Sequence, residues 1–194
     1  MPFLSLGAHP SLARALALRG YDQPTPVQSS VLAPELRGRD LLVSSRTGSG
    51  KTVAFGLVLG DALLGAEPAF GKAAAPLGLV VAPTRELAVQ VQRELAWLLA
   101  EAGGRVVACV GGMDARREAR ALSEGAHVVV GTPGRLLDHH RLLDHDRLGL
   151  DDGSTLEAGG AAQLVAWVGH NRLMDVPTFA WPAPAMITSS PRDS

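Results

Sequence analysis

The chain has 194 residues, of which 46% are hydrophobic, and its formal net charge is −1. This length suits one domain with a tail, and the hydrophobic share is sufficient for a core. The near-zero charge excludes a protein that binds nucleic acid through an overall basic field, so any such binding has to come from a local site.

The predicted elements alternate between strands and helices along the chain. Strands are expected at 41–44, 79–81, 105–110 and 128–130, and helices at 12–19, 50–64, 84–100, 114–122 and 133–139. A proline-stiffened turn is expected from Tyr21 to Gln28, and a loop from Ala66 to Pro76. Short apolar strands that alternate with helices predict an α/β fold whose parallel sheet has helices on both faces. Functional residues are then expected at the carboxyl ends of the strands.

The segment from Ser45 to Thr52 follows one predicted strand and opens a helix, which is the context of a phosphate-binding loop. Two glycines let backbone N–H groups turn toward phosphate oxygens, and the helix start adds its positive dipole end. A lysine would contact the outer phosphates, and a threonine would hold Mg²⁺. The candidate residues for the nucleotide are Thr47, Gly48, Ser49, Gly50, Lys51 and Thr52, with Thr52 also the metal ligand. Ser45 departs from the general pattern, which has glycine there.

A second candidate segment, from Gly20 to Gln28, lies upstream of this loop. Its two prolines fix the turn, and a glutamine side chain can pair with the N6/N7 edge of adenine. Tyr21 is a candidate to pack on the adenine ring, and Gln28 to select it. An ordinary proline-rich turn is the alternative for this segment taken alone.

Together with three further segments, these motifs resemble the first RecA-like lobe of the DEAD-box ATP-dependent RNA helicases over residues 3–140. The order matches the family: an upstream Phe3, the Q motif at Gly20 to Gln28, and motif I at Ser45 to Thr52. The other matching segments are Pro83-Thr84-Arg85-Glu86-Leu87-Ala88 as motif Ia, then Gly111-Gly112, and finally Thr132-Pro133-Gly134-Arg135 as motif Ib.

The resemblance implies a P-loop NTPase lobe that binds ATP and Mg²⁺ and grips the backbone of one RNA strand without reading its sequence. The residues implied for RNA are Thr84, Arg85, Gly111, Gly112, Thr132 and Arg135. Hydroxyls, loop N–H groups and arginines are suitable donors for phosphate. Thr84 and Thr132 are also expected to cap the helices that follow them.

The resemblance ends after residue 140. No Asp-Glu-Ala-Asp tetrad and no Ser-Ala-Thr motif occur in the chain, and the second lobe of the family with its arginine fingers is missing. No catalytic residue is therefore assigned, and Asp151-Asp152 is interpreted as a solvated turn. The chain divides into a lobe at 1–140 and a divergent tail at 141–194, expected to be non-native or disordered, with loop from Thr178 to Ser194.

Two explanations of the tail are open. The segment from Arg135 to His139 recurs as Arg141 to His145, which favours a frameshift or small duplication over a deliberate short variant. By resemblance, the function is that of an RNA helicase lobe that binds ATP but does not hydrolyse it appreciably. The alternatives are a non-enzymatic nucleotide- or RNA-binding fragment and, against the Q motif and motif Ia, another P-loop enzyme such as a small kinase.

Two smaller features complete the predictions. Cys109 lies in an apolar run, which predicts a buried, unreactive thiol and fits a reducing cytoplasm. His139, His140 and His145 suggest a metal site, but their spacing does not place three ligands on one helix face, so a solvated helix end is expected. No targeting segment and no apolar run long enough for a membrane is visible.

Overall fold

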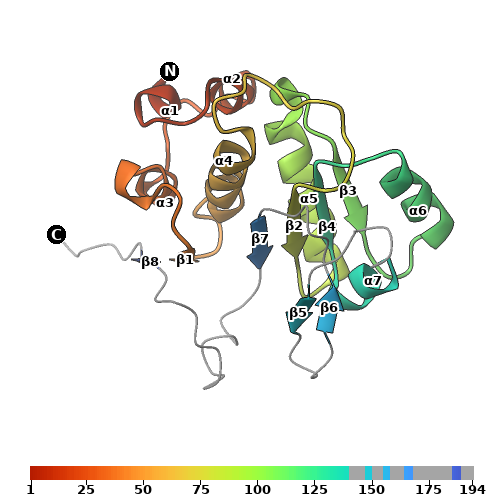
Figure 1. The fold of residues 1–194 in the computed structure, drawn as a ribbon. Helices are drawn as coiled ribbons and strands as arrows, with labels where there is room; N and C mark the ends of the chain where they lie inside the picture. The colour runs from red at the N-terminus through yellow and green to blue at the C-terminus, as the bar shows by residue number, and fades with distance from the viewer. Residues whose placement is uncertain (140–146, 150–154, 158–163, 168–184, 189–194) are drawn as a thin grey trace.

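The computed structural model describes residues 1–139, 147–149, 155–157, 164–167 and 185–188 (Figure 1). The chain begins with three short helices that each start at a proline, whose fixed φ suits a first helical turn. They are α1 (Pro2–Ser5), α2 (Pro10–Leu18) and α3 (Pro26–Val31), followed by the 3-10 turn η1 (Pro34–Leu36). Gln28 therefore lies in the first turn of a helix, where the sequence predicted only a turn.

Strands and helices alternate through the rest of the lobe, close to the predicted ranges. The elements are β1 (Leu41–Ser44), α4 (Lys51–Leu64), β2 (Gly78–Val81), α5 (Arg85–Leu98), η2 (Ala100–Ala102), β3 (Val106–Cys109), α6 (Ala115–Ser123), β4 (Val128–Gly131) and α7 (Pro133–Asp138). All strand pairings among β2, β3, β4 and β7 (Leu164–Trp167) are parallel, in the order β3-β4-β2-β7. The predicted parallel sheet is confirmed.

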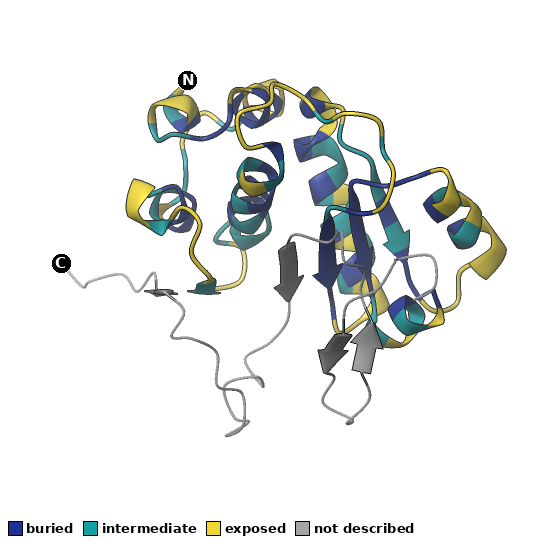
Figure 2. Ribbon diagram, viewed as in Figure 1, coloured by how far each residue is buried: buried dark blue, intermediate teal, exposed yellow. Residues whose placement is uncertain are grey.

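Alternate residues of the central strands point to opposite faces, as the pleat requires. In β4, Val128 and Val130 join a core cluster with α4 and α5, whereas Val129 faces a second cluster that includes Leu122 of α6 and Leu136 of α7. Helices therefore cover both faces of the sheet. Burial is greatest along β2 and β4, and the ends of the loops are exposed (Figure 2).

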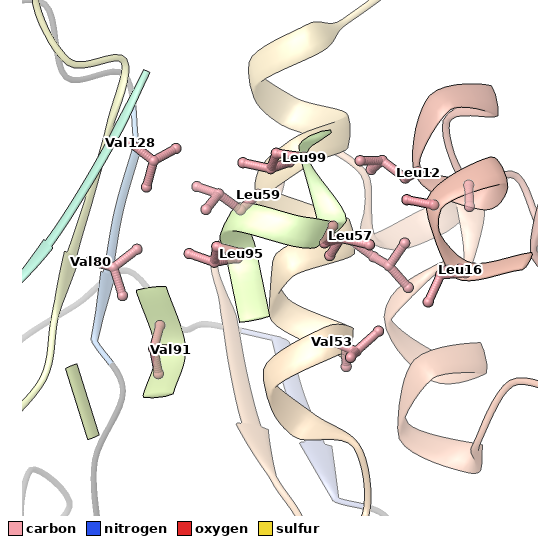
Figure 3. Close-up of a cluster of buried hydrophobic side chains, with 14 of the residues drawn as sticks. Leu12, Leu16, Val53, Leu57, Leu59, Val80, Val91, Leu95, Leu99 and Val128 are labelled. Carbon is pink, nitrogen blue, oxygen red and sulfur yellow. The ribbon is translucent and has the colours of Figure 1, made fainter. Parts of the chain in front are cut away.

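The larger core cluster runs from the sheet through two helices to the N-terminal helices (Figure 3). Leu57 of α4 and Leu95 of α5 are fully buried between Val80 of β2 and Leu16 of α2. Small residues let the helices approach closely, since a Cβ on Gly56 would meet Leu98 and Leu95 at 2.8 and 2.9 Å. This packing fixes the direction of α4 and hence of the loop that precedes it.

The tail contributes strands that the sequence did not predict. β8 (Ala185–Thr188) pairs in parallel with β1, and β7 with β2, while β5 (Arg147–Gly149) and β6 (Thr155–Glu157) form an antiparallel pair. The predicted loop from Thr178 to Ser194 is thus wrong at β8. An open strand edge offers backbone N–H and C=O groups to any extended segment, so strand pairing does not require a run of β-branched residues.

Several earlier interpretations fall outside the described residues, among them the Asp151-Asp152 turn, His140 and His145. Within the described part of the chain, none of the helices is sufficiently long and apolar to cross a bilayer.

Candidate functional site

The phosphate-loop segment forms a compact turn between β1 and α4. Gly48 and Gly50 have φ of +80° and +84°, a region that side chains rarely occupy. Gly50 is the N-cap of α4 and offers no side chain to its N–H groups, so the first turn of the helix keeps free donors. Thr47 and Gly48 are exposed at the tip, and Ser49, Lys51 and Thr52 are half-buried.

Lys51 lies within the loop that it is predicted to serve. Its ammonium donates to the backbone carbonyl oxygens of Ser45 and Arg46, the latter at 2.7 Å. The departure at Ser45 also has a structural role, because its hydroxyl donates to the Ser49 hydroxyl at 2.7 Å and bridges the two sides of the turn. The loop has the positive charge and the uncapped N–H groups that a phosphate chain requires.

Gln28 connects the Q motif with the phosphate loop. The side chain is fully buried, its Oε1 accepts from the Thr25 N–H at 2.9 Å, and its Nε2 donates to the Gly50 carbonyl oxygen at 3.3 Å. The structure therefore brings the two predicted nucleotide segments together, although they are 22 residues apart.

Tyr21 contacts an aromatic side chain of α5. Its ring stacks on Trp97 of α5, with centroids 5.7 Å apart. The Arg19 guanidinium lies over the Trp97 ring, 4.9 Å from its centroid. The phenol ring thus has an aromatic partner within the protein. The sequence did not predict this contact because Trp97 is far along the chain.

The predicted RNA segments follow β2, β3 and β4 at one edge of the sheet. Thr84 caps α5 as predicted, since its hydroxyl accepts from the Leu87 N–H at 3.3 Å. The Arg85 guanidinium lies directly against Gly112, where any Cβ would clash with it, and Gly112 has a φ of +77°. Thr84, Arg85, Gly111 and Gly112 are all exposed. The structure therefore joins motif Ia to the glycine pair.

Thr132 and Arg135 differ from the expectation. Thr132 is the N-cap of α7, but its side chain makes no cap hydrogen bond, so the expected cap is wrong at this helix. The Arg135 side chain is only 15% exposed. Its guanidinium pairs with Glu118 at 3.4 Å and Asp138 at 3.8 Å and donates to the Met113 carbonyl oxygen at 3.2 Å.

Glu118 is the residue that sequence reasoning missed. It lies in the helix predicted to be polar, yet it is 4% exposed. Its Oε1 accepts from the Val110 N–H at 3.1 Å, and its Oε2 lies 2.8 Å from His139 Nε2. A buried carboxylate has to be paired, and these partners lie immediately after β3 and immediately after α7. The only local signal was one acid inside a helix whose neighbours are arginines.

His139 is buried at 6% exposure, so the expectation of a solvated helix end is wrong for this residue, although Asp138 beside it is exposed. Its partner, Glu118, is 21 residues away in the chain, which explains why the local pattern did not show it. Cys109 is buried as predicted, and burial, together with the Glu118 charge, raises the pKa of its thiol to about 12.

The donor atoms of Cys109, Glu118 and His139 lie within 4.8 Å of one another, and their types are those that zinc uses. However, Arg135 already places a positive charge beside the same carboxylate. The cluster therefore fits a buried ion-pair network better than a metal centre.

Comparison with known proteins places this lobe in a family. Residues 25–155 match the DEAD/DEAH box helicase family, which is more than half of the chain. The chain belongs to the DEAD/DEAH box helicases. The helicase family domain contains the phosphate loop and the RNA-side segments described above, and the predicted resemblance is confirmed.

Similar proteins include the DEAD-box ATP-dependent RNA helicase CshA of Bacillus cereus, 39% identical over 71% of this chain and 25% of that protein. The ATP-dependent rRNA helicase rrp3 of Emericella nidulans is 43% identical over 71% of this chain and 28% of its own length. The chain thus spans about a quarter of the helicases it matches.

Solved helicase structures share the fold. The RNA helicase Prp28 from Chaetomium thermophilum, bound to ADP, superposes with a TM-score of 0.68 at 34% identity over 88% of this chain and 38% of that chain. Mss116p bound to single-stranded RNA and AMP-PNP gives a TM-score of 0.63 at 27% identity over 73% of this chain and 30% of that chain. The RecA-like architecture predicted from the motifs is confirmed.

Proposed function

We propose that this helicase lobe binds ATP with Mg²⁺ and holds the backbone of a single RNA strand, and that the 194-residue chain does not hydrolyse ATP appreciably. The observation that carries the proposal is the phosphate loop, in which Lys51 is already turned onto the loop's own carbonyl oxygens. The Gly50 N-cap leaves the adjacent N–H groups available to anions.

The groups present fit a magnesium nucleotide. Lys51 would leave the two carbonyl oxygens for the outer phosphates, and Thr52 in the first turn of α4 would offer a hydroxyl to Mg²⁺. The remaining contacts of the loop come from Thr47, Gly48, Ser49 and Gly50. When bound, the metal would neutralise phosphate charge.

Gln28 is proposed to select adenine, in agreement with its place beside Gly50. To reach a base, the Gln28 amide has to exchange the bonds it now makes to Thr25 and Gly50. Tyr21 likewise has to give up its contact with Trp97. Gln28→Ala is expected to lower the ratio of ATP to GTP affinity by about tenfold. Gln23→Ala, at an exposed site in the same motif, is the matched control. An unchanged ratio in Gln28→Ala would remove this residue from the adenine site.

RNA is proposed to lie across the loops that follow strands β2, β3 and β4. The proposed contacts are Thr84, Arg85, Gly111, Gly112, Thr132 and Arg135, as the family resemblance implies. Few charges are involved, so binding is expected to be weak. The contacts go to phosphates and not to bases, so binding is also expected to be sensitive to salt and independent of sequence. Titration of a labelled single strand at two salt concentrations measures each of these properties.

Hydrolysis is the sharpest test of the proposal. Phosphoryl transfer to water needs a group that orients the water and a charge that stabilises the transition state. The 194 residues contain no Asp-Glu-Ala-Asp tetrad to supply the first. A steady-state ATPase assay with saturating RNA is expected to show negligible turnover. Turnover on the order of 1 s⁻¹ that disappears in Lys51→Ala would contradict the proposal.

A further inference from the structure

We propose that Glu118 is a positioning residue for RNA binding, which sets the glycine pair and motif Ib in register with each other. The proposal rests on the RNA-binding role proposed above. Helix α6 lies outside the family motifs, and in this proposal it holds two of them, the glycine pair and motif Ib, in place.

The first step is the bond to the strand end. Glu118 Oε1 accepts from the N–H of Val110, the residue immediately before Gly111-Gly112, at 3.1 Å. Both groups are buried, so no water can replace the carboxylate there without cost. This bond fixes the point at which the backbone leaves β3 and hence the start of the exposed glycine pair.

Glu118 also pairs with motif Ib. Its Oε2 lies 3.4 Å from Arg135 Nε, an ion-pair contact within α7, and 2.8 Å from His139 Nε2, directly after the last residue of that helix. Arg135 in turn donates to the carbonyl oxygen of Met113, just beyond the glycine pair. The glycine pair is thus held from both sides, by Glu118 before it and by Arg135 after it.

The arrangement requires a charged carboxylate at position 118. The Arg135 guanidinium lies within ion-pair distance of Glu118 and Asp138 and donates one hydrogen bond, to the Met113 carbonyl oxygen, while both oxygens of the Glu118 carboxylate have partners. Bonds between a buried charge and its partners contribute more than neutral ones. Loss of the charge frees Arg135 from α6 while the apolar packing of Leu122 and Leu136 remains.

Glu118→Gln is the decisive variant, because it keeps the shape and an acceptor for the Val110 N–H but removes the charge. We expect the dissociation constant of a fluorescent single-stranded oligo(U) to rise about tenfold, whereas that of a fluorescent ADP analogue stays within about twofold, since the phosphate loop shares no partner with Glu118. Glu124→Gln is the matched control. It removes an exposed acid paired with Arg105 near the same helix, and should change neither constant.

A local signature separates positioning from a general loss of stability. In ¹⁵N-labelled protein, Glu118→Gln should shift the amide signals of Gly111 and Gly112 and leave those of Gly48 and Gly50 in place. If the parent chain binds no oligo(U), the proposed RNA function fails, and these signals alone decide the role of Glu118. Unmoved Gly111 and Gly112 signals, or equal oligo(U) affinity in parent and variant, overturn the inference.

A second pair of variants covers the case in which Glu118→Gln does not fold. His139→Gln keeps a donor near the position of Nε2, and His139→Leu removes it. The donor should restore oligo(U) affinity, so His139→Gln is expected to bind like the parent and His139→Leu about threefold more weakly, because one of several bonds to Glu118 is lost. Equal affinity in these two variants, with ADP-analogue binding intact, contradicts the proposal.

Discussion

The proposed nucleotide side and the proposed RNA side of this lobe are built in opposite ways. The phosphate loop holds itself, through the Lys51 bonds to its own carbonyl oxygens and the bond between the Ser45 and Ser49 hydroxyls. The RNA side is held by a buried carboxylate, whose partners are Val110 after β3, Arg135 in α7 and His139 after α7. One surface is a local turn of the chain, whereas the other is an assembly of distant segments.

This difference determines how each side is expected to respond to substitution. In the loop, the residues proposed to contact the ligand and those that fix the loop are the same. On the RNA side, the exposed residues and the buried residues that place them are different, so binding can be lost without touching the surface. The predictions below test this contrast, beginning with the largest expected effect.

Lys51→Ala should reduce ATP affinity on the order of a hundredfold, because the Lys51 ammonium is the group proposed to bind the outer phosphates directly. RNA affinity measured without nucleotide should not change. Lys72, the other lysine of the chain, is exposed in the loop before β2, and Lys72→Ala is the matched control. Fluorescence titration with an ATP analogue gives both constants. An equal loss in the two variants would show that only the net charge matters.

Gly50→Ala should lower ATP affinity about tenfold and stability by roughly 2 kcal/mol, through the cost of a positive φ and displacement of a buried neighbour. A Cβ at this position would meet Gln28 Nε2 at 2.5 Å, and Gln28 is fully buried. Gly48→Ala has the same strain in φ but open space around it, so it should cost about half as much. Thermal unfolding and analogue titration check both variants, and equal effects would contradict the contact between Gln28 and the loop.

The contrast also explains what the sequence could predict. The phosphate loop was predictable residue by residue from Ser45 to Thr52, because its glycines, lysine and helix start are contiguous. The alternation of strands and helices predicted the sheet, since apolar runs are a local signal. The Gln28–Gly50 bond was not predicted, because the two residues are 22 apart in the chain; the family pattern assigned Gln28 only to the nucleotide site.

The RNA-side network was not predictable, for a physical reason. Glu118 and His139 each look like solvated residues of polar helices, and their burial follows only from the way α6 and α7 pack on β3 and β4. Similarly, β7 and β8 arise from backbone pairing at strand edges, which no side-chain pattern in the tail announces. A local sequence pattern gives no information about contacts between residues that are far apart in the chain.

Gly112→Ala should weaken RNA binding about fivefold, because its Cβ pushes aside the Arg85 guanidinium and the residue has a strained φ of +77°. Gly111→Ala is the neighbouring control. Its Cβ meets nothing within 4 Å, so it should cost less. Titration with the labelled single strand measures the two affinities. A larger loss at Gly111 would show that the contact between Arg85 and the glycine pair does not matter for binding.

Cys109 reports on how well the RNA side is sealed from water, and the expected effect is the smallest. Burial raises the pKa of its thiol from 9.0 to about 12, so the folded chain holds the proton more tightly than the unfolded chain does. The resulting stability is fully present below about pH 9 and is lost as the pH rises toward 12.

Cys109→Ala isolates this contribution from other groups that titrate in the same range. The difference in unfolding free energy between parent and variant should shrink by roughly 1 kcal/mol from about pH 8 to about pH 10. Urea denaturation at the two pH values measures it. Since Cys109 is the only cysteine, a thiol reagent gives an independent reading: labelling should follow unfolding rather than the pH. A difference that stays constant with pH, or rapid labelling of the folded chain, would mean that water reaches the interior beside Glu118, and the buried network would then be too weakly sealed to hold the two RNA segments as proposed.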